Sequence, residues 1–387
     1  MTFGLLALIV AAGLAGPLLS VGRGAVVPVV VGELAAGVVI GKTGFGWLDP
    51  QAPGVPFFAD VGFAMLMFAA GLNVPVRQPG IAHGLRRGLL AAIVVAVLAV
   101  PAGIAVAAAT PHGHGAIYAL LLASGSAAIL LPILDEQKLL SDPRAIVVMA
   151  QVGIADVAAI VALPLVIQPH RALHAALGGL AVIAAAIGAL FIARALRPTR
   201  LVDRLRHDSK RRSWALDLRV SLLVLYTLAW IAQRSGTSIL IAGFAVGLLV
   251  ASVGGPKRLS TQVTGIAAGF FVPLFFVVLG ADLDLRGLFQ RPSTLELTVL
   301  LLAANVAVHV LGALATRQSP GAGLAATAQL GLPAAVATLG LRLGTLSSPQ
   351  AAAILLAALG TIALCPIGTA RLRREPSTER PRPARRA

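Results

Sequence analysis

The chain has 387 residues, of which 58% are hydrophobic and 12% are charged, and its mean hydropathy is +0.90. Soluble domains carry about 25% charged residues, so this composition excludes an ordinary soluble protein, and it is too apolar for a disordered chain. Cys365 is the only cysteine, which excludes a disulfide scaffold. The net charge of +16 would suggest nucleic-acid binding in a soluble protein, but in an apolar chain basic residues usually flank membrane spans. We therefore expect membrane lipids as partners, and no nucleic acid.

Apolar segments follow one another along the whole chain, each close to the roughly 20 residues that a helix needs to cross a bilayer. The thirteen segments cover approximately residues 2–20, 25–41, 54–72, 86–110, 113–134, 143–167, 173–194, 213–233, 237–252, 264–281, 294–315, 321–343 and 349–370. The alternating pattern of β-barrel strands is not visible in the sequence. These segments predict an all-α polytopic membrane protein with about 13 transmembrane helices over residues 1–370, followed by a basic, disordered cytoplasmic tail over 371–387.

Basic residues are distributed unevenly between the two ends of these spans. If the basic tail is cytoplasmic, an odd number of spans places the N-terminus outside, and 24 of the 31 Lys and Arg residues then lie on the cytoplasmic side. The largest group is the run from Arg194 to Arg212, which is typical of a cytoplasmic connector. We predict a multi-pass protein of the plasma (inner) membrane with its N-terminus outside and its C-terminus in the cytoplasm.

The two halves of the chain resemble each other at an offset of about 205–210 residues. ELAAGVVI around Gly37 matches GFAVGLLV around Gly247, MLMFAAGLN ending at Asn73 matches LFFVVLGAD ending at Asp282, and ASGSAAILLP matches AQLGLPAAVA. Six helices within about residues 1–167 would then repeat as six helices within about 213–370. A single linker helix over about 173–194 inverts the second copy in the membrane.

Inverted repeats that contain paired, Gly/Pro-interrupted helices are typical of alternating-access transporters, because interrupted helices expose carbonyls and helix ends to an ion at mid-membrane. The fifth segment carries such an interruption at Ser124–Ser126, and the twelfth carries one beside Gln329 and Pro333. We predict that these two are discontinuous crossing helices that line a transport site. Tight packing of small residues is the alternative interpretation, since any membrane bundle uses it.

Few ionisable residues lie well inside the spans, and Asp156 lies midway along 143–167. Burial of a charge at the bilayer centre is costly, so such a residue is a functional candidate. A carboxylate can hold either a proton or a hard monovalent cation, and competition for one site couples the two fluxes. Gln151 is the other strong polar group of this inner stretch. Glu33 and Asp60 lie nearer segment ends, where structural pairing is favoured.

His309 lies in the middle of its segment, one helical turn from Asn305 and on the same face. It could pair with Asp156 and release it when a cation binds, or it could be hydrogen-bonded to a helix carbonyl. The candidate ion-binding and proton-coupling residues are Asp156, His309, Ser124, Ser126, Gln151, Asn305 and Gln329.

Four stretches resemble, in this order, successive parts of one family. VVPVVVGELAAGVVIGKTGFGWL resembles its early helix, FFADVGFAMLMFAAGLNV its third helix, SGSAAILLPILDEQKLL its crossing helix, and GFFVPLFFVVLGADLDL the helix that closes its later panel. From about residue 4 to 370 the chain is similar to the second superfamily of monovalent cation:proton antiporters, the bacterial sodium/hydrogen exchangers. The order of the motifs carries the resemblance, because no single motif is specific.

The resemblance implies a homodimer in which a core bundle moves like an elevator against a dimerisation panel. It also implies that Asp156 is the acidic ion-binding residue, with Ser124 and Ser126 at polar positions of the first crossing helix. The chain departs from the family twice: Ala155 stands where Asp, Asn or Gln is common, and His309 where Lys or Arg is expected. These departures leave the cation, the stoichiometry and the pH range open.

We therefore expect a secondary active antiporter, and not an enzyme, that exchanges a monovalent cation for protons by alternating access and serves pH homeostasis. Na⁺ is the first candidate, with Li⁺ and K⁺ as alternatives; Asp156 would bind the cation, and no further cofactor is expected. Two other functions stay open. One is a transport-inactive sensor of the same fold, for which Ala155 is the reason, and the other is an intramembrane serine protease with Ser126 and His309 as its dyad.

Overall fold

The computed structural model describes residues 1–375 except 22–28, 73–80, 112, 141, 170–171, 197–207, 210, 213, 236–238, 254–256 and 291. All regular elements in this described part are helical, and nine helices there are long and apolar enough to cross a membrane. Three shorter apolar helices and the interrupted segment at Gly115–Glu136 account for the remaining predicted spans. The prediction of an all-α membrane protein with interrupted helices is confirmed.

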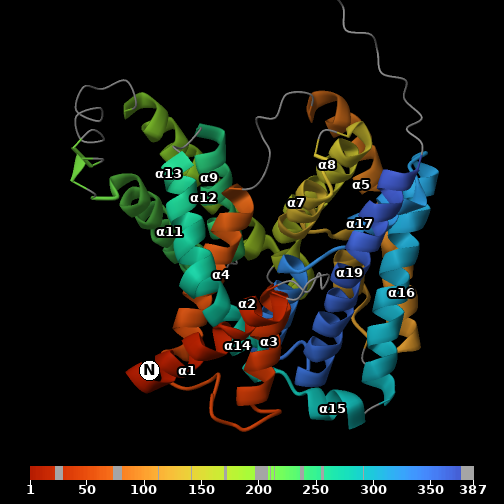
Figure 1. The fold of residues 1–387 in the computed structure, drawn as a ribbon, viewed down its shortest axis with the longest axis horizontal. Coiled ribbons are helices and arrows are strands. Elements are labelled where there is room, and N and C mark those ends of the chain that lie inside the picture. The colour runs from red at the N-terminus through yellow and green to blue at the C-terminus, as the bar shows by residue number, and fades with distance from the viewer. Residues whose placement is uncertain are drawn as a thin grey trace, which may run out of the picture.

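The helices form two groups that lie side by side in Figure 1. One group, called the panel here, contains α1 (Phe3–Gly13), α2 (Ala15–Ser20), α3 (Val29–Ile40), α4 (Val55–Leu72), α12 (Ile239–Val253), α13 (Lys257–Ile266) and α14 (Val272–Asp282), with a π-helical turn over Ala267–Phe271. The other group, called the core bundle, contains α5 (Ile81–Ala109), α6 (Gly115–Ala123), α7 (Ala127–Glu136), α8 (Pro143–Ile167), α16 (Pro292–Ala315), α17 (Pro320–Ala326), α18 (Gly331–Leu343) and α19 (Ser348–Arg374).

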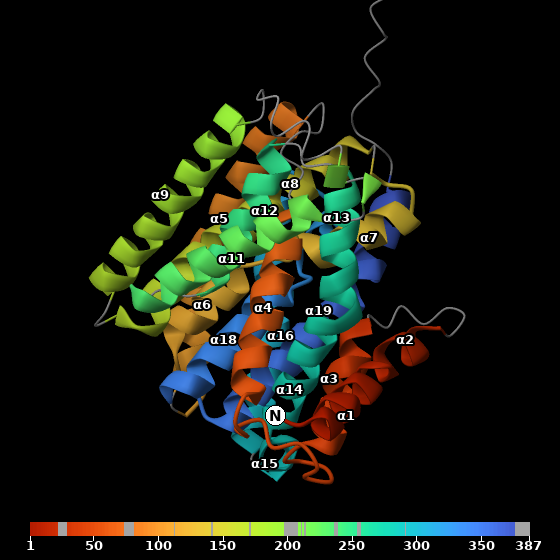
Figure 2. The ribbon, with the colours of Figure 1, turned by 90° about the vertical axis from the view of Figure 1, so that its left-hand side faces the viewer.

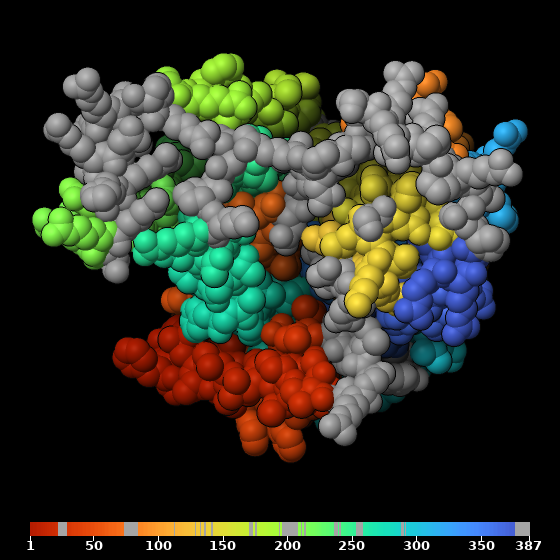
Figure 3. All heavy atoms as spheres, turned by 45° about the horizontal axis from the view of Figure 1, so that its top comes forward, coloured from red at the N-terminus to blue at the C-terminus, as the bar shows by residue number. Residues whose placement is uncertain are grey.

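Three helices connect or flank these groups: α9 (Ala172–Leu196), α11 (Leu216–Arg234) and the short α15 (Leu285–Gln290). Figure 2 shows α9 as the outermost of the helices on its side of the molecule. The space-filling view shows the red N-terminal helices and the teal α13 and α14 on one side, and the yellow α7 and α8 with the blue C-terminal helices on the other (Figure 3). The last helix extends to Arg374, past the expected boundary at 370, and residues 376–387 of the predicted tail lie outside the described residues.

In the described part of the panel, two reciprocal glycine pairs each bring a helix of the first half against a helix of the second. A Cβ atom on Gly37 would lie 2.2 Å from Val277 O, and one on Gly280 would lie 2.2 Å from Leu34 O, so α3 and α14 touch through their backbones. Close approach of this kind is the usual role of small residues between membrane helices.

The second contact joins α4 and α12 in the same manner. A Cβ atom on Gly71 would lie 2.4 Å from Phe244 O, and one on Gly247 would lie 2.3 Å from Phe68 O. Gly247 follows Gly37 by 210 residues and Gly280 follows Gly71 by 209. The motifs matched in the sequence therefore form equivalent contacts in the two halves, as an internal repeat requires. Asn73, which ends one of these motifs, lies outside the described residues.

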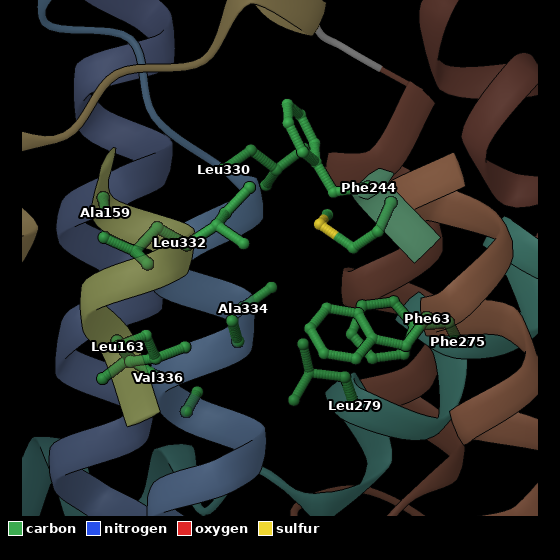
Figure 4. Packing of buried hydrophobic residues seen from close by; sticks show 14 of the residues in the cluster. Phe63, Ala159, Leu163, Phe244, Phe275, Leu279, Leu330, Leu332, Ala334 and Val336 are labelled. Carbon is green, nitrogen blue, oxygen red and sulfur yellow. The ribbon is translucent and has the colours of Figure 1, made fainter. Parts of the chain in front are cut away.

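Apolar side chains meet where the panel faces the core bundle. Figure 4 shows Leu332 and Ala334 of α18 on one side, opposite Phe63 of α4 and Phe275 of α14. The two phenylalanine rings are stacked with centroids 4.7 Å apart. The side chains labelled at this contact are all apolar and carry no hydrogen-bonding groups.

An ion pair crosses from the panel to the core bundle at the rim of this apolar surface. Arg342 of α18 contacts Asp60 of α4, with Nη2 2.6 Å from Oδ1 and Nη1 2.9 Å from Oδ2. Arg342 also lines a cavity of about 430 Å³. The structural pairing expected for Asp60 is thus confirmed, whereas Glu33 differs: its Oε2 is buried without a hydrogen-bond partner among the described residues.

Candidate functional site

The first interruption separates α6 from α7 at Ser124, Gly125 and Ser126. Ser124 adopts an extended conformation (φ −85°, ψ 167°), which ends α6, and the carbonyl of Ser126 accepts the backbone N–H of Leu130 at 3.1 Å as α7 begins. Gly125 is needed here because a Cβ atom would lie 2.9 Å from Val152 of α8. The break therefore packs directly on the helix that carries Asp156.

The second interruption separates α17 from α18 over residues 327–330. Thr327 ends α17 with its hydroxyl 2.8 Å from Leu324 O, and it is fully buried. The two breaks meet, because Ser124 Oγ lies 2.9 Å from Oε1 of Gln329. These two residues are 205 positions apart, which is the offset of the internal repeat. The predicted crossing of two discontinuous helices is confirmed by this contact.

Asp156 faces the beginning of α7. Its carboxylate accepts a hydrogen bond from the backbone of Ala127, the first residue of that helix, and the side chain is buried. The N-terminal end of a helix carries a partial positive charge and N–H groups that lack helical partners. The crossing thus offers the carboxylate a stabilising dipole in place of a basic side chain.

The position of Asp156 depends on how α8 begins. Asp142 caps this helix by accepting the backbone N–H of Arg144 at 2.8 Å, and the Arg144 guanidinium binds the same carboxylate. Burial alone would raise the pKa of the Asp142 carboxyl. The hydrogen bonds and the charge of Arg144 outweigh this effect and hold the pKa below its ordinary value. The guanidinium also donates to Glu375 O at the end of α19, which fixes the two helix ends together.

His309 approaches the opposite end of the first break. Its Nδ1 lies 3.0 Å from Asn305 O, one turn earlier on α16, and the ring also makes a hydrogen bond to the backbone of Ser124. A carbonyl oxygen can only accept, so the bond at Nδ1 requires a proton on that nitrogen. The alternative that the sequence left open, a histidine bound to a helix carbonyl, is what the structure shows. Asp156 and His309 therefore flank the same short break.

The remaining candidates fall into two groups. Ser126 is buried in the break itself, and Asn305 is buried on the face of α16 that carries His309. Gln151 instead lies 3.5 Å from Nε2 of Gln318, in the connection between α16 and α17. Neither Thr327 nor Gln318 was predicted from the sequence. The signal for Thr327 was a polar residue beside the Gly/Pro-rich stretch that marks the second break.

The groups at the crossing are suited to a singly charged hard cation. One carboxylate stands among hydroxyl, amide and main-chain oxygens, the ligand types that hard metal ions prefer. The described residues contain no group of three or more His, Cys, Asp or Glu side chains arranged to hold a metal ion. A site with one negative charge balances one monovalent cation or one proton.

A substitution at Gln329 tests whether the cation binds at the crossing. Gln329→Ala removes the side-chain partner of Ser124 and is expected to weaken apparent cation affinity about tenfold, which corresponds to one buried hydrogen bond of roughly 1.4 kcal/mol. The measurement is cation-dependent thermal stabilisation of the purified protein. Leu225→Ala, a fully buried truncation in α11, is the control that should leave the affinity unchanged. Equal losses in both variants would contradict a site at the crossing.

Comparison with protein families gives one match over nearly the whole chain. The model described as the transmembrane sodium/hydrogen exchanger matches residues 5–374. Among solved structures, that of the sodium proton antiporter MjNhaP1 from Methanocaldococcus jannaschii at pH 8 superposes with a TM-score of 0.66. The superposition covers 97% of this chain and 98% of that chain at 14% identity, which shows that the fold is shared.

Two curated relatives are similar over most of the chain. YjbQ of Bacillus subtilis (strain 168) is 23% identical over 365 residues, and the high-affinity Na(+)/H(+) antiporter NhaS3 of Synechocystis sp. is 25% identical over 338 residues. The matches include 88% and 75% of this chain, respectively. The chain spans 58% of the length of YjbQ and 70% of that of NhaS3.

Proposed function

Since the chain belongs to the transmembrane sodium/hydrogen exchanger family, we propose that it is a secondary active antiporter that exchanges a monovalent cation for protons across a membrane. The observation that carries the proposal is Asp156, a buried carboxylate bound to the first N–H of α7 where the two broken helices cross. Na⁺ is the first candidate, because NhaS3 is named a Na(+)/H(+) antiporter, with Li⁺ and K⁺ as alternatives.

In the proposed mechanism, Asp156 holds either the cation or a proton, and never both. Ser124, Ser126 and Gln329 supply neutral groups at the break, and His309 makes hydrogen bonds to main-chain atoms of Asn305 and Ser124. The core bundle then moves against the panel and exposes the carboxylate to the two sides in turn. The apolar contact between α18 and the panel (Figure 4) suits this motion, and the Asp60–Arg342 pair would open during it.

The same proposal includes the cellular setting and the assembly. It places the protein in the plasma membrane, and the charge distribution of the loops supports an orientation with the N-terminus outside and the C-terminus in the cytoplasm. The family resemblance supports a homodimer formed through the panel. The protease alternative requires a Ser126–His309 dyad, but the hydrogen bonds that the structure gives His309 are to main-chain atoms of Asn305 and Ser124.

Proteoliposomes that contain the purified protein and a pH-sensitive dye test the exchange. Addition of NaCl outside should drive Na⁺ inward and protons outward, so the lumen becomes alkaline. Choline chloride, whose bulky quaternary ammonium cation cannot be coordinated closely by oxygen ligands, should have no effect. A lumen pH that responds to neither salt, nor to LiCl or KCl, would reject the antiporter and favour the transport-inactive alternative.

The charge balance of the site leads to a prediction about stoichiometry. One carboxylate exchanges one Na⁺ for one proton, so we expect electroneutral exchange and Na⁺ uptake that an imposed membrane potential changes by less than about twofold. His309→Gln keeps a donor for the Asn305 carbonyl and should retain exchange with an altered pH profile. A strong response to voltage would show that a second proton moves. Complete inactivity of the folded His309→Gln protein would show that the ring does more than donate hydrogen bonds.

A further inference from the structure

Asn305 is the residue with the least satisfied side chain at the crossing. The residue is 1% exposed, and both Oδ1 and Nδ2 lack a hydrogen-bond partner among the described residues. Buried amide groups are almost always paired, since each unpaired donor or acceptor costs about 1–3 kcal/mol. A buried amide with two unpaired atoms therefore indicates a polar species that occupies the space beside it.

The neighbours of Asn305 on α16 show which part of the molecule it faces. His309, one turn later on the same side, binds the backbone of Ser124 at the end of α6. Leu301, one turn earlier, lines a cavity of about 10 Å³ together with Gln329 and Leu121. Residues four apart on a helix share a face. Asn305 thus lies on the face of α16 between two residues that both touch the crossing.

The carbonyl end of α6 is where a cation is favoured. The C-terminal end of a helix carries a partial negative charge and carbonyls that lack helical partners. The opposite end of the break, at α7, carries the N–H groups that bind Asp156. The break therefore has the carboxylate at its α7 end and neutral oxygens at its α6 end, so a cation in the break can contact both. The cavity beside Gln329 has room for about one water molecule.

We propose that Asn305 is a ligand of the transported cation, with Oδ1 bound to the partly dehydrated ion at the carbonyl end of α6 and Nδ2 donating to a water that the ion retains. This inference rests on the proposed antiport function and assigns one of its specificity-determining residues. The bound ion and the water that it retains satisfy both amide atoms, which explains why the sequence places an unpaired amide in an otherwise apolar stretch of α16. A site that offers an amide oxygen favours small, hard cations over organic ones.

The decisive variant is Asn305→Leu, which keeps nearly the same volume and removes both unpaired polar atoms. We expect the apparent KM for Na⁺ in proteoliposomes to rise at least about tenfold, while the maximal rate changes by less than about threefold. In Na⁺-free buffer the Tm should not fall, because no protein hydrogen bond is lost; the increase in Tm that Na⁺ gives the unaltered protein should be reduced. Asn305→Ala should show the same loss of affinity.

Thr298→Val provides the matched control. Thr298 lies on the same buried face of α16, and its hydroxyl is bound at 3.2 Å to Thr294 O. This variant should leave the KM for Na⁺ within about twofold of the original value. An Asn305→Leu protein that folds and keeps its KM and its Na⁺-dependent Tm increase would overturn the inference. An unaltered protein that Na⁺ stabilises, but that moves no protons, would overturn the antiport function and not the role of Asn305.

Discussion

Replacement of Asp156 with Asn is expected to reduce cation-dependent proton movement to the level of protein-free liposomes, while the protein remains folded and inserted. Asparagine has nearly the same size and can still accept the hydrogen bond from Ala127, so the local structure should persist. It cannot release a proton, and it carries no charge to balance a cation. The measurement is the change in lumen pH on addition of NaCl, with the Tm as the check on folding.

Asp60→Asn is the control for this experiment, because it removes a carboxylate whose observed partner is Arg342 at the rim of the panel. The Asp60–Arg342 pair is partly exposed, and such pairs contribute about 1 kcal/mol or less. We expect the exchange rate of Asp60→Asn to change by no more than about fivefold. Normal antiport by a purified Asp156→Asn protein would remove Asp156 from the mechanism.

Gly247→Ala should be strongly destabilising for so small a substitution in the panel. The added methyl group would lie 2.3 Å from Phe68 O and 2.7 Å from Gly71 Cα, so two helix backbones must separate to make room. Overpacking of this kind typically costs about 1–3 kcal/mol, and more where the obstacle is backbone. We expect a fall in the Tm of the detergent-purified protein of several degrees, with a matching loss for Gly37→Ala at the equivalent contact.

Gly188→Ala in α9 is the comparison for the glycine series. A Cβ atom on Gly188 would meet nothing within 4 Å, and alanine is favoured over glycine in a helix by about 1 kcal/mol. This substitution should leave the Tm unchanged or raise it. If Gly247→Ala is equally harmless, the close contact between α4 and α12 does not contribute to stability.

The sequence predicted the helices best where local signals mark their ends. The segment 143–167 coincides with α8, because Asp142 and Pro143 form an N-cap and a first helical position that can be identified without the structure. The predicted segment 264–281 begins too late, because the observed helix starts at Lys257. Its first residues, KRLSTQVTG, are polar, and a hydropathy pattern does not detect them. The break within 2–20 at Leu14 was also missed, because both of its sides are equally apolar.

The crossing could be predicted in outline and not in its contacts. Ser-Gly-Ser in an apolar stretch identified the first break, and the repeat identified the second. The bond between Ser124 and Gln329 depends on how two helices 205 residues apart pack together, which no local pattern contains. For the same reason the pairing of Gln151 with Gln318 was not foreseen. The burial of Asn305 without partners is visible only once its neighbours are placed.

The central claim is that one proton and one cation share Asp156. The most direct test is the apparent Kd for Na⁺ of the purified protein, measured from Na⁺-dependent thermal stabilisation at a series of pH values. Where the site is protonated in the absence of Na⁺, each cation bound must displace one proton. The Kd should therefore rise about tenfold for each unit by which the pH falls, and Asp156→Asn should show no Na⁺ dependence at any pH. A Kd that is the same at every pH would contradict a shared site.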